Sequence, residues 1–269
     1  MDANVRHLMT QLRQNPLDFG VLNSLRQHCE ATQSFAVWAE ALEHHARAAT
    51  DADSDPVELG RLHYELGNLY RNQLGRSDRA LEHYKTAIDL DAAQRPALAA
   101  ARSISTEAGN WADVAELLAR EADSLPVGPK RAATLVELAK LQQERLGHGE
   151  DAENSLREAA SYAPEDLQVQ HELATLLLDH ADHSKNNGVA TRKRREAADV
   201  LSAMARAVSD DYAFAYVESA LDAMPDHADS LELLELVAPR MGRSDTLAPR
   251  WLAAIRGTQN RTLARTLRL

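Results

Sequence analysis

Residues 66–92 of this chain are repeated at 138–164. Small and apolar positions recur unchanged, whereas the charged positions between them vary. The unchanged residues are Leu66, Leu69, Leu74, Gly75, Ala80 and Ala87, which return as Leu138, Leu141, Leu146, Gly147, Ala152 and Ala159. Gly67 corresponds to Ala139, and Tyr84 corresponds to Leu156. Fixed packing positions with a variable surface indicate a repeated structural unit, and arrays of such units usually serve as scaffolds rather than catalysts.

Each copy is predicted to form two helices joined by a tight turn. Leucines spaced three and four residues apart give the first helix one apolar face. Asp55-Pro56 is a typical helix start, since Asp caps free amides and Pro needs no donor at the first helical position. Gly75 ends this helix, because a residue without Cβ adopts the left-handed turn without strain. Ala80 is small where the helices cross and Tyr84 is large where the gap widens, so an antiparallel hairpin is expected.

These residues resemble the tetratricopeptide repeat family. The first copy carries its pattern as Leu66-Gly67, Tyr70, Gly75, Ala80, Tyr84 and Ala87, with Ala92 where Pro is usual. The second carries it as Leu138-Ala139, Gly147, Ala152, Leu156, Ala159 and Pro164, with Gln142 in place of the aromatic residue. Both copies have one residue more than the family pattern in the turn. The resemblance implies an all-α fold, an α-solenoid of antiparallel helical hairpins wound into a TPR-like superhelix.

The same pattern extends over most of the chain in diverged form. We expect a single TPR-like α-solenoid over residues 1–258, followed by a basic C-terminal helix or tail at 259–269. The best repeats are 60–93 and 132–165, and the diverged units are 17–49, 95–124, 167–208 and 210–257. Three or more repeats satisfy the minimum for such arrays, since each repeat buries its apolar face only against its neighbours.

Composition and charge restrict the classes of partner. The net charge is −11 and aromatic residues make up 4% of the chain, which disfavours nucleic acid and anionic lipid as general ligands. The N-terminus lacks the apolar stretch of a signal peptide, and no segment approaches the length of a membrane span. Cys29 is the single cysteine, so no internal disulfide can form, and a cytoplasmic location is expected.

Two basic segments interrupt the acidic composition. The first is Arg192, Lys193, Arg194 and Arg195, and the second contains Arg250, Arg256, Arg261, Arg265 and Arg268. Either could recognise phosphates or acidic protein surfaces. The alternative is a solvated helix start in the first case and a docked last helix, with Leu263 and Leu267 as its apolar stripe, in the second. Residues 183–190 are expected to form a mobile loop, with Arg192–Arg195 opening the next helix.

No motif for catalysis or for a cofactor or metal was found. Asp51, Asp53 and Asp55 begin like a calcium loop, but Pro56 replaces the required Gly and Leu62 the required Glu. His180, Asp182 and His183, and likewise the pair His44-His45, are interpreted as solvated side chains. Cys29 is interpreted as a small core residue. The chain is therefore predicted not to be an enzyme and to bind no cofactor or metal.

Function must then come from the surface. The resemblance implies that the first helices of successive hairpins line a concave groove that holds a partner peptide or helix. The positions it places there are Arg61, Tyr64, Asn68, Arg71, Asn72, Lys140, Gln143 and His171. Asn68 stands where some members grip a peptide backbone or its terminal carboxylate. Ser103, Val136 and Thr175 do not supply the full two-carboxylate clamp of chaperone-binding members.

The leading hypothesis is a non-enzymatic cytoplasmic scaffold or adaptor that binds a protein partner. A nucleic-acid-associated helical protein acting through 185–195 and 250–268 is an alternative, as is a regulatory subunit of a larger complex. Homo-oligomerisation is compatible with both the scaffold and the subunit hypothesis.

Overall fold

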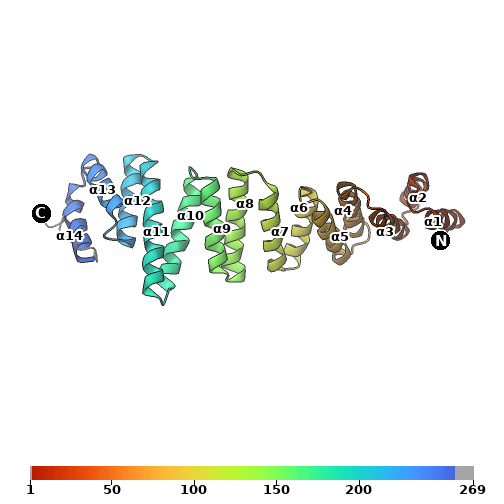
Figure 1. Cartoon of the computed structure of the whole chain (residues 1–269), viewed down its shortest axis with the longest axis horizontal. Coiled ribbons are helices and arrows are strands. Elements are labelled where there is room, and N and C mark those ends of the chain that lie inside the picture. Colours follow the sequence, from red (N-terminus) through yellow and green to blue (C-terminus); the bar gives the residue numbers. More distant parts are fainter. Residues whose placement is uncertain (1, 258–269) are drawn as a thin grey trace. The chain divides into compact units, whose positions relative to one another are not determined.

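The structure, a computed structural model, describes residues 2–257 and contains helices but no strand within that range. The predicted all-α fold class is confirmed, and the helices pack in consecutive pairs (Figure 1). The chain divides into two compact units, residues 1–125 and 126–269, and each unit is described separately below. The assignment of residues 1–258 to one solenoid stays a prediction, and the predicted segment 259–269 lies outside the described residues. No helix in the described range is long and apolar enough to cross a membrane.

The first unit begins with α1 and continues as three hairpins, α2–α3, α4–α5 and α6–α7. Its helices are α1 (Ala3–Gln14), α2 (Phe19–Ala31), α3 (Phe35–Asp51), α4 (Pro56–Asn72), α5 (Ser77–Leu90), α6 (Arg95–Glu107) and α7 (Trp111–Ser124). Leu12, Leu25, Leu66 and Leu98 are fully buried in one continuous apolar core. As predicted, Asp55 caps α4, with its carboxylate accepting from the Val57 amide at 3.2 Å. Cys29 is buried in the same core, as predicted, and burial raises the pKa of its thiol.

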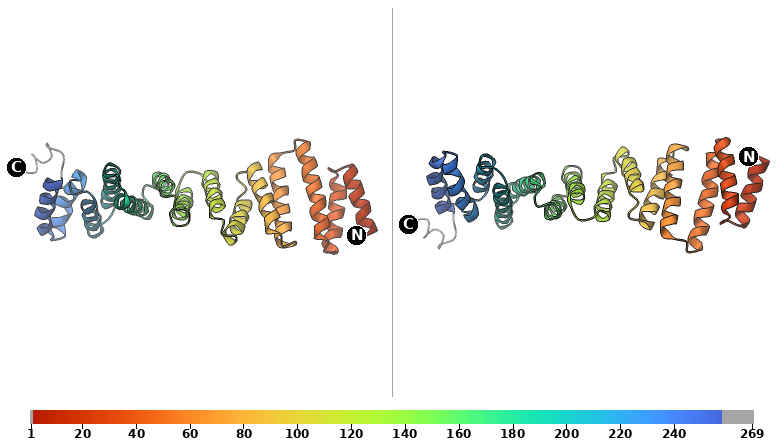
Figure 2. Two further views of the ribbon diagram at one scale, coloured as in Figure 1. Left: turned by 90° about the horizontal axis from the view of Figure 1, so that it is seen from below. Right: turned by 90° about the horizontal axis from the view of Figure 1, so that it is seen from above.

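The second unit contains the hairpins α8–α9, α10–α11 and α12–α13, followed by α14; Figure 2 gives two further views of the hairpins. Its elements are α8 (Pro129–Leu141), a π-helical turn η1 (Gln142–Leu146), α9 (Gly149–Tyr162), α10 (Leu167–His183), α11 (Asn187–Arg206), α12 (Asp210–Ala223), α13 (Ala228–Arg240), a 3-10 turn η2 (Ser244–Thr246) and α14 (Leu247–Gly257). Val217, Leu221, Leu231 and Leu234 are buried in the core near its C-terminal end.

The turns of the two sequence copies close with the same kind of long backbone hydrogen bond, although only the second copy contains a π-helical turn, η1. Each first helix ends in a widened turn that the next helix follows directly. In the first copy, the turn is closed by a hydrogen bond of 2.8 Å from the Arg76 amide to the Tyr70 carbonyl. In the second copy, the His148 amide donates to the Gln142 carbonyl at the same distance. Gly75 and Gly147 adopt left-handed φ angles of 63° and 68° at these turns. An extra residue thus widens the helix end without disturbing the hairpin.

Gly67 packs directly against Tyr84 within the first repeated hairpin. A Cβ atom at this position would lie 2.4 Å from Cε1 of Tyr84, a separation at which one of the two groups must move. The Tyr84 ring is buried, and its hydroxyl donates to Oδ1 of Asn68 at 2.8 Å. The tyrosine therefore fills the space that the glycine leaves.

The predicted loop at 183–190 is wrong, because α10 runs to His183 and α11 begins at Asn187. Asn186 caps α11 by accepting from the amides of Gly188 at 2.9 Å and Val189 at 3.2 Å. The asparagine was the overlooked helix signal. Arg192–Arg195 consequently lie in the second turn of α11 and not at its start, where the positive end of the helix would disfavour them.

Candidate partner-binding grooves

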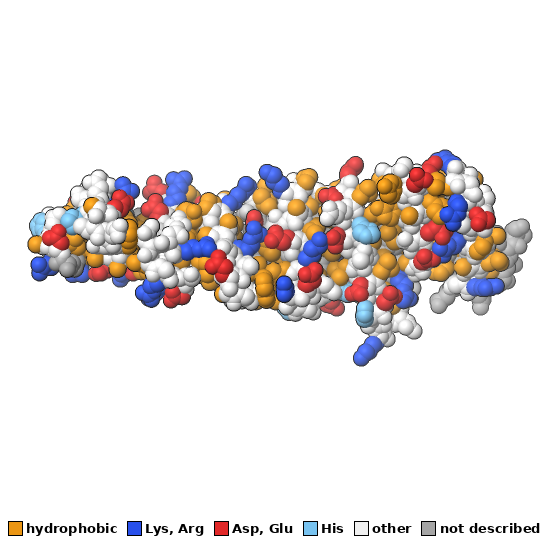
Figure 3. Space-filling view, turned by 180° about the vertical axis from the view of Figure 1, so that it is seen from behind, with side chains coloured by type: hydrophobic (Ala, Val, Ile, Leu, Met, Phe, Trp, Pro, Cys, Tyr) orange, Lys and Arg blue, Asp and Glu red, His pale blue; other side chains and the backbone are white. Residues whose placement is uncertain are grey.

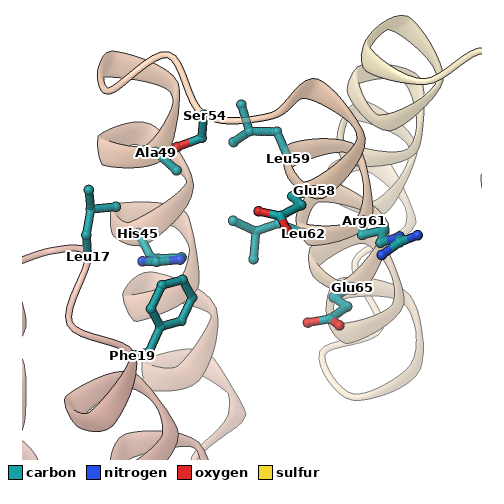
Figure 4. Close-up of a pocket in the computed structure, with 10 residues that line it drawn as sticks. All are labelled: Leu17, Phe19, His45, Ala49, Ser54, Glu58, Leu59, Arg61, Leu62 and Glu65. Atoms are coloured by element: carbon teal, nitrogen blue, oxygen red, sulfur yellow. The ribbon is translucent and has the colours of Figure 1, made fainter.

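A groove in the first unit lies between the start of α2 and α4, over α3; we call it the first-unit groove (Figure 4). Its volume is about 440 Å³. Apolar side chains from all three helices line it together with two glutamates and an arginine. The lining residues are Leu17, Phe19, His45, Ala49, Ser54, Glu58, Leu59, Arg61, Leu62 and Glu65.

Phe19 is the most prominent apolar side chain of this groove. It is 71% exposed, more than any other large hydrophobic residue within 2–257. Its ring meets the edge of the His45 ring, with centroids 5.3 Å apart and planes at 71°. Nδ1 of His45 in turn lies 2.7 Å from the Pro16 carbonyl, which can only accept, so Nδ1 is the donor. His45 thereby ties the chain that leads into α2 to α3, and holds Phe19 at the mouth of the groove.

His45 was predicted to be solvated, and that prediction is wrong: the residue is buried. The same correction applies to His180. Its Nδ1 contacts the Glu153 carboxylate, and its Nε2 lies 3.2 Å from Oε1 of Gln143. In both cases, the partner that removes the histidine from solvent is distant in the sequence.

A second groove, of about 280 Å³, occupies the corresponding place in the second unit and is called the second-unit groove. It lies between α8 and α10 over α9, and is lined by Ala139, Lys140, Gln143, Glu144, Leu156, Glu172, Thr175, Leu176 and Asp179. The Lys140 ammonium pairs with the Glu172 carboxylate at 2.8 Å and so connects its two walls.

Of the residues predicted to bind a partner in the first unit, Arg61 lines the first-unit groove. Tyr64 is half-buried with its ring 5.8 Å from that of Tyr84, and Asn68 accepts from the Tyr84 hydroxyl. Arg71 donates to Glu107 at 2.8 Å and to Ser103 at 2.9 Å, both on α6. Asn72 is exposed at the end of α4. The side chains of Tyr64, Asn68 and Arg71 thus have partners within their own unit.

In the second unit, Lys140 and Gln143 lie together in the groove, whereas His171 is exposed and is not among its lining residues. The prediction that residues of both units share one continuous groove stays a prediction.

The basic run on α11 is partly engaged within the unit. Lys193 contacts the Glu153 carboxylate, and Arg194 pairs with Asp182 at 2.9 Å. Arg192 and Arg195 are exposed. Two of the four cations proposed for an acidic partner or for phosphates therefore hold neighbouring helices instead.

Glu153 is the centre of a buried ionic cluster in the second unit. Its side chain is 4% exposed and meets Lys193, His180 and Arg157, the last at 2.9 Å. Burial pushes the pKa of Glu153 up, but the hydrogen bonds from Lys193 and His180 outweigh burial and the net pKa is lowered. The carboxylate therefore stays charged, and it joins α9 to α10 and α11.

A histidine pair occupies a smaller cavity of about 330 Å³ between α3, α4 and α5. Nδ1 of His63 lies 3.1 Å from Nδ1 of His83, so one nitrogen must donate and the other accept. Burial, together with the charge of His83, lowers the pKa of His63 to about 4. The His83 ring stacks on Tyr70, whose hydroxyl donates to Glu43 at 2.5 Å. Within the described range, no group of three or more His, Cys, Asp or Glu side chains is arranged to hold a metal.

A Ser–His–Asp arrangement occurs at the start of α13 but faces the interior. Nδ1 of His227 lies 2.8 Å from the Ser230 hydroxyl, and Nε2 lies 2.9 Å from the Asp199 carboxylate. Ser230 is 0% exposed and the neighbouring Ser202 1%, so neither hydroxyl can meet a substrate. This polar cluster connects α11 to α13 and does not form a nucleophilic site.

Of the residues that line the first-unit groove, only Arg61 was predicted from the sequence to bind a partner. Leu17 and Phe19 surround Asp18, which caps α2 through the Val21 amide at 3.1 Å. An aromatic residue directly after such a cap can be recognised in the sequence. Whether its side chain is exposed depends on the angle between this hairpin and the next, and that angle cannot be predicted from the neighbouring residues.

No protein-family model and no curated protein matches this chain. Among solved structures, it is similar to YrrB, described as a TPR protein with an unusual peptide-binding site, at 15% identity and a TM-score of 0.34 over 86% of this chain and 98% of that one. It is also similar to a tetratricopeptide repeat protein from Parabacteroides merdae, at 15% identity and a TM-score of 0.34 over 99% and 98% of the two chains. A third match is the TPR2AB domain of yeast Sti1 in complex with pHSP90, at 15% identity and a TM-score of 0.31 over 98% and 88%. The solved structures that this chain resembles over most of its length are thus tetratricopeptide repeat proteins.

Proposed function

We propose that this chain is a non-enzymatic scaffold or adaptor of the cytoplasm that binds a segment of another protein in the first-unit groove. The observation that carries the proposal is the exposed Phe19, held by His45 at the mouth of an apolar groove. Aromatic side chains in such positions dominate the energetics of many protein interfaces, because they bury a large area at little entropic cost. Tetratricopeptide repeats typically bind proteins or peptides, which agrees with this use of the groove.

The predicted residues contribute to the proposal in different ways. Arg61 is among the residues that line the first-unit groove, although its side chain extends to the side of α4 away from Phe19 (Figure 4). Asn68 uses its carbonyl oxygen for Tyr84, which leaves its amide hydrogens to donate to a partner backbone. Lys140 and Gln143 line the second-unit groove, which is a further place for the same partner. Tyr64, Arg71, Asn72 and His171 remain proposed contacts.

Within residues 2–257, the nucleic-acid alternative gains no support from the positions of the cations. Lys193, Arg194 and Arg250 are engaged with acidic side chains of their own unit. On the face that Figure 3 shows, acidic and basic side chains are interspersed on each unit rather than gathered into a basic surface. Phosphate recognition needs several free cations on one surface.

The test is selection of peptides from a displayed library on the whole protein, followed by titration of the best binder against variants. We expect Phe19→Ala to weaken binding by about tenfold or more, the loss of one good apolar anchor. Tyr212→Ala is the matched control, because Tyr212 is also exposed but lies in the second unit. Equal affinity for the wild-type protein and Phe19→Ala would contradict the proposed site.

A further inference from the structure

Ion pairs cross between alternate helices in both units. In each of three cases, a Lys or Arg on one helix pairs with a glutamate on the next helix but one, either later or earlier in the chain. These pairs are Arg71 of α4 with Glu107 of α6 at 2.8 Å, Lys140 of α8 with Glu172 of α10 at 2.8 Å, and Arg250 of α14 with Glu218 of α12 at 2.6 Å. Each pair therefore connects the two walls of the slot between one hairpin and the next.

The slot between α2 and α4, which holds the first-unit groove, has the glutamates but not the cation. Glu58 and Glu65 are exposed and line the groove, and neither pairs with a Lys or Arg within residues 2–257. Arg61, which lies between them on α4, extends to the other side of the helix from Phe19 (Figure 4). On the opposite wall, Arg26 of α2 donates to Asn23 of its own helix at 3.1 Å.

The surroundings of the groove increase its negative potential. The end of α3 and the turn that leads into α4 carry three exposed aspartates and no base, namely Asp51, Asp53 and Asp55, of which Asp51 lines the histidine cavity. The effective dielectric constant beside an apolar groove is lower than in water. Two carboxylates at its rim therefore repel each other and attract a cation that enters the groove. The groove thus combines an apolar floor with an acidic wall.

We infer that the first-unit groove takes a cationic amphipathic helix of a protein partner, an inference that rests on the proposed function. Glu58 and Glu65 are seven residues apart on α4, which is about 10.5 Å along a helix, and Leu62 lies between them on the same face. A helix lying alongside α4 presents residues seven apart at the same spacing. Lys or Arg at positions i and i+7 then meets the two glutamates, and a large apolar side chain at i+3 or i+4 meets Leu62 and Phe19. The partner supplies the cations that Arg71, Lys140 and Arg250 supply in three other slots.

The probe is a fluorescein-labelled, alanine-rich helical peptide of about 20 residues with one leucine between two arginines seven positions apart, long enough to be partly helical alone. A second peptide carries glutamate in place of both arginines. Anisotropy titrations use the full-length protein at roughly 50 and 300 mM NaCl, because screening weakens ion pairs at a groove rim. We expect the arginine peptide to bind at least about tenfold more tightly than the glutamate peptide, with the difference shrinking at the higher salt.

The double variant Glu58→Lys/Glu65→Lys should reverse this preference. Glu165→Lys/Glu235→Lys is the control, because it changes the net charge equally at exposed second-unit sites and should leave the preference intact. If the control abolishes the preference as fully, the attraction is to the net charge of −11 and the inference is overturned.

The remaining outcomes separate the inference from the proposed function. Equal binding of both peptides, weakened in both by Phe19→Ala, overturns the charge selectivity and supports the groove as a binding site. Failure of both peptides to bind also overturns the inference, whereas the proposed function is decided by the library-selected peptides.

Discussion

At the residue scale, Gly67 and Tyr84 act as one packing unit. The second repeat has Ala139 and Leu156 at the same places, so a larger residue on one helix accompanies a smaller one on the other. Both correspondences are visible in the sequence, but only the approach of the two helices shows that they compensate each other. For that reason, the sequence alone shows them as two separate substitutions.

Gly67→Ala is expected to destabilise the protein. The new methyl group must displace the Tyr84 ring, at a cost of roughly 1–3 kcal/mol, while the better helix propensity of alanine returns up to about 1 kcal/mol. A second substitution, Tyr84→Leu, recreates the Ala–Leu combination of the second repeat. In that background Gly67→Ala should be neutral or stabilising, as measured by urea unfolding in a double-mutant cycle. Additive effects of the two substitutions would show that the two side chains do not compete for space.

The His63–His83 pair makes stability depend on pH. The folded-state pKa of His63, about 4, lies below the ordinary value of 6.5, so the unfolded chain binds the proton first. The stability that the protein has with neutral His63 is therefore fully present above pH 6.5. The free energy of unfolding then falls as the pH drops from 6.5 towards 4, because the unfolded chain takes up the proton and the folded one does not. At about pH 5 we expect a loss of about 1–2 kcal/mol, after allowing for partial solvent screening.

His63→Gln should make the unfolding free energy less sensitive to pH between 7 and 5 by that amount, as measured by urea unfolding at each pH. The exposed His171→Gln serves as the control and should keep the wild-type slope. An unchanged slope in His63→Gln would assign the pH dependence to other groups.

At the element scale, the features that were predicted best are those determined by residues adjacent in the sequence. The Asp55-Pro56 start of α4 and the left-handed turn at Gly75 depend on local chemistry, and both were predicted from the sequence. The start of α11 is also local, but the Asn186 signal was hidden by polar neighbours that suggest a loop. The engagement of Lys193 could not be predicted, because its acidic partner, Glu153, lies on α9, two helices earlier.

The attachment of α11 can be tested at Glu153. Glu153→Gln removes the charge that Lys193, His180 and Arg157 share, and leaves the lysine largely buried without its counter-ion. We expect a loss of about 2–4 kcal/mol in the free energy of unfolding, typical of breaking a buried ion pair from one side. Urea unfolding measures it.

Glu150→Gln is the control for that experiment, because Glu150 is exposed in the first turn of the same helix. It should cost only a few tenths of a kcal/mol, the usual contribution of a carboxylate near a helix start. Similar losses in both variants would mean that the Glu153 cluster contributes no more than a surface charge.

At the scale of the whole molecule, the repeat architecture limits how far a local change extends. Each hairpin packs mainly on its neighbours in sequence, and the apolar core of the first unit is formed by residues of that unit alone. In such arrays, stability is approximately a sum of repeat and nearest-neighbour contributions, so parts of the chain can open separately. The fold class could be predicted from the repeated segments alone for this reason, whereas the grooves depend on how one hairpin is tilted against the next.

Native-state amide hydrogen exchange tests this independence with the same two variants. Gly67→Ala should accelerate exchange in α4, α5 and the helices next to them, and leave the protected amides of α9 to α13 unchanged. Glu153→Gln should do the reverse, with α9, α10 and α11 exchanging faster, because opening of either unit does not require opening of the other. Equal acceleration of exchange across both units in either variant would mean that the described helices open as one cooperative body. Each substitution would then lower the stability of all the described helices and not only of its own unit.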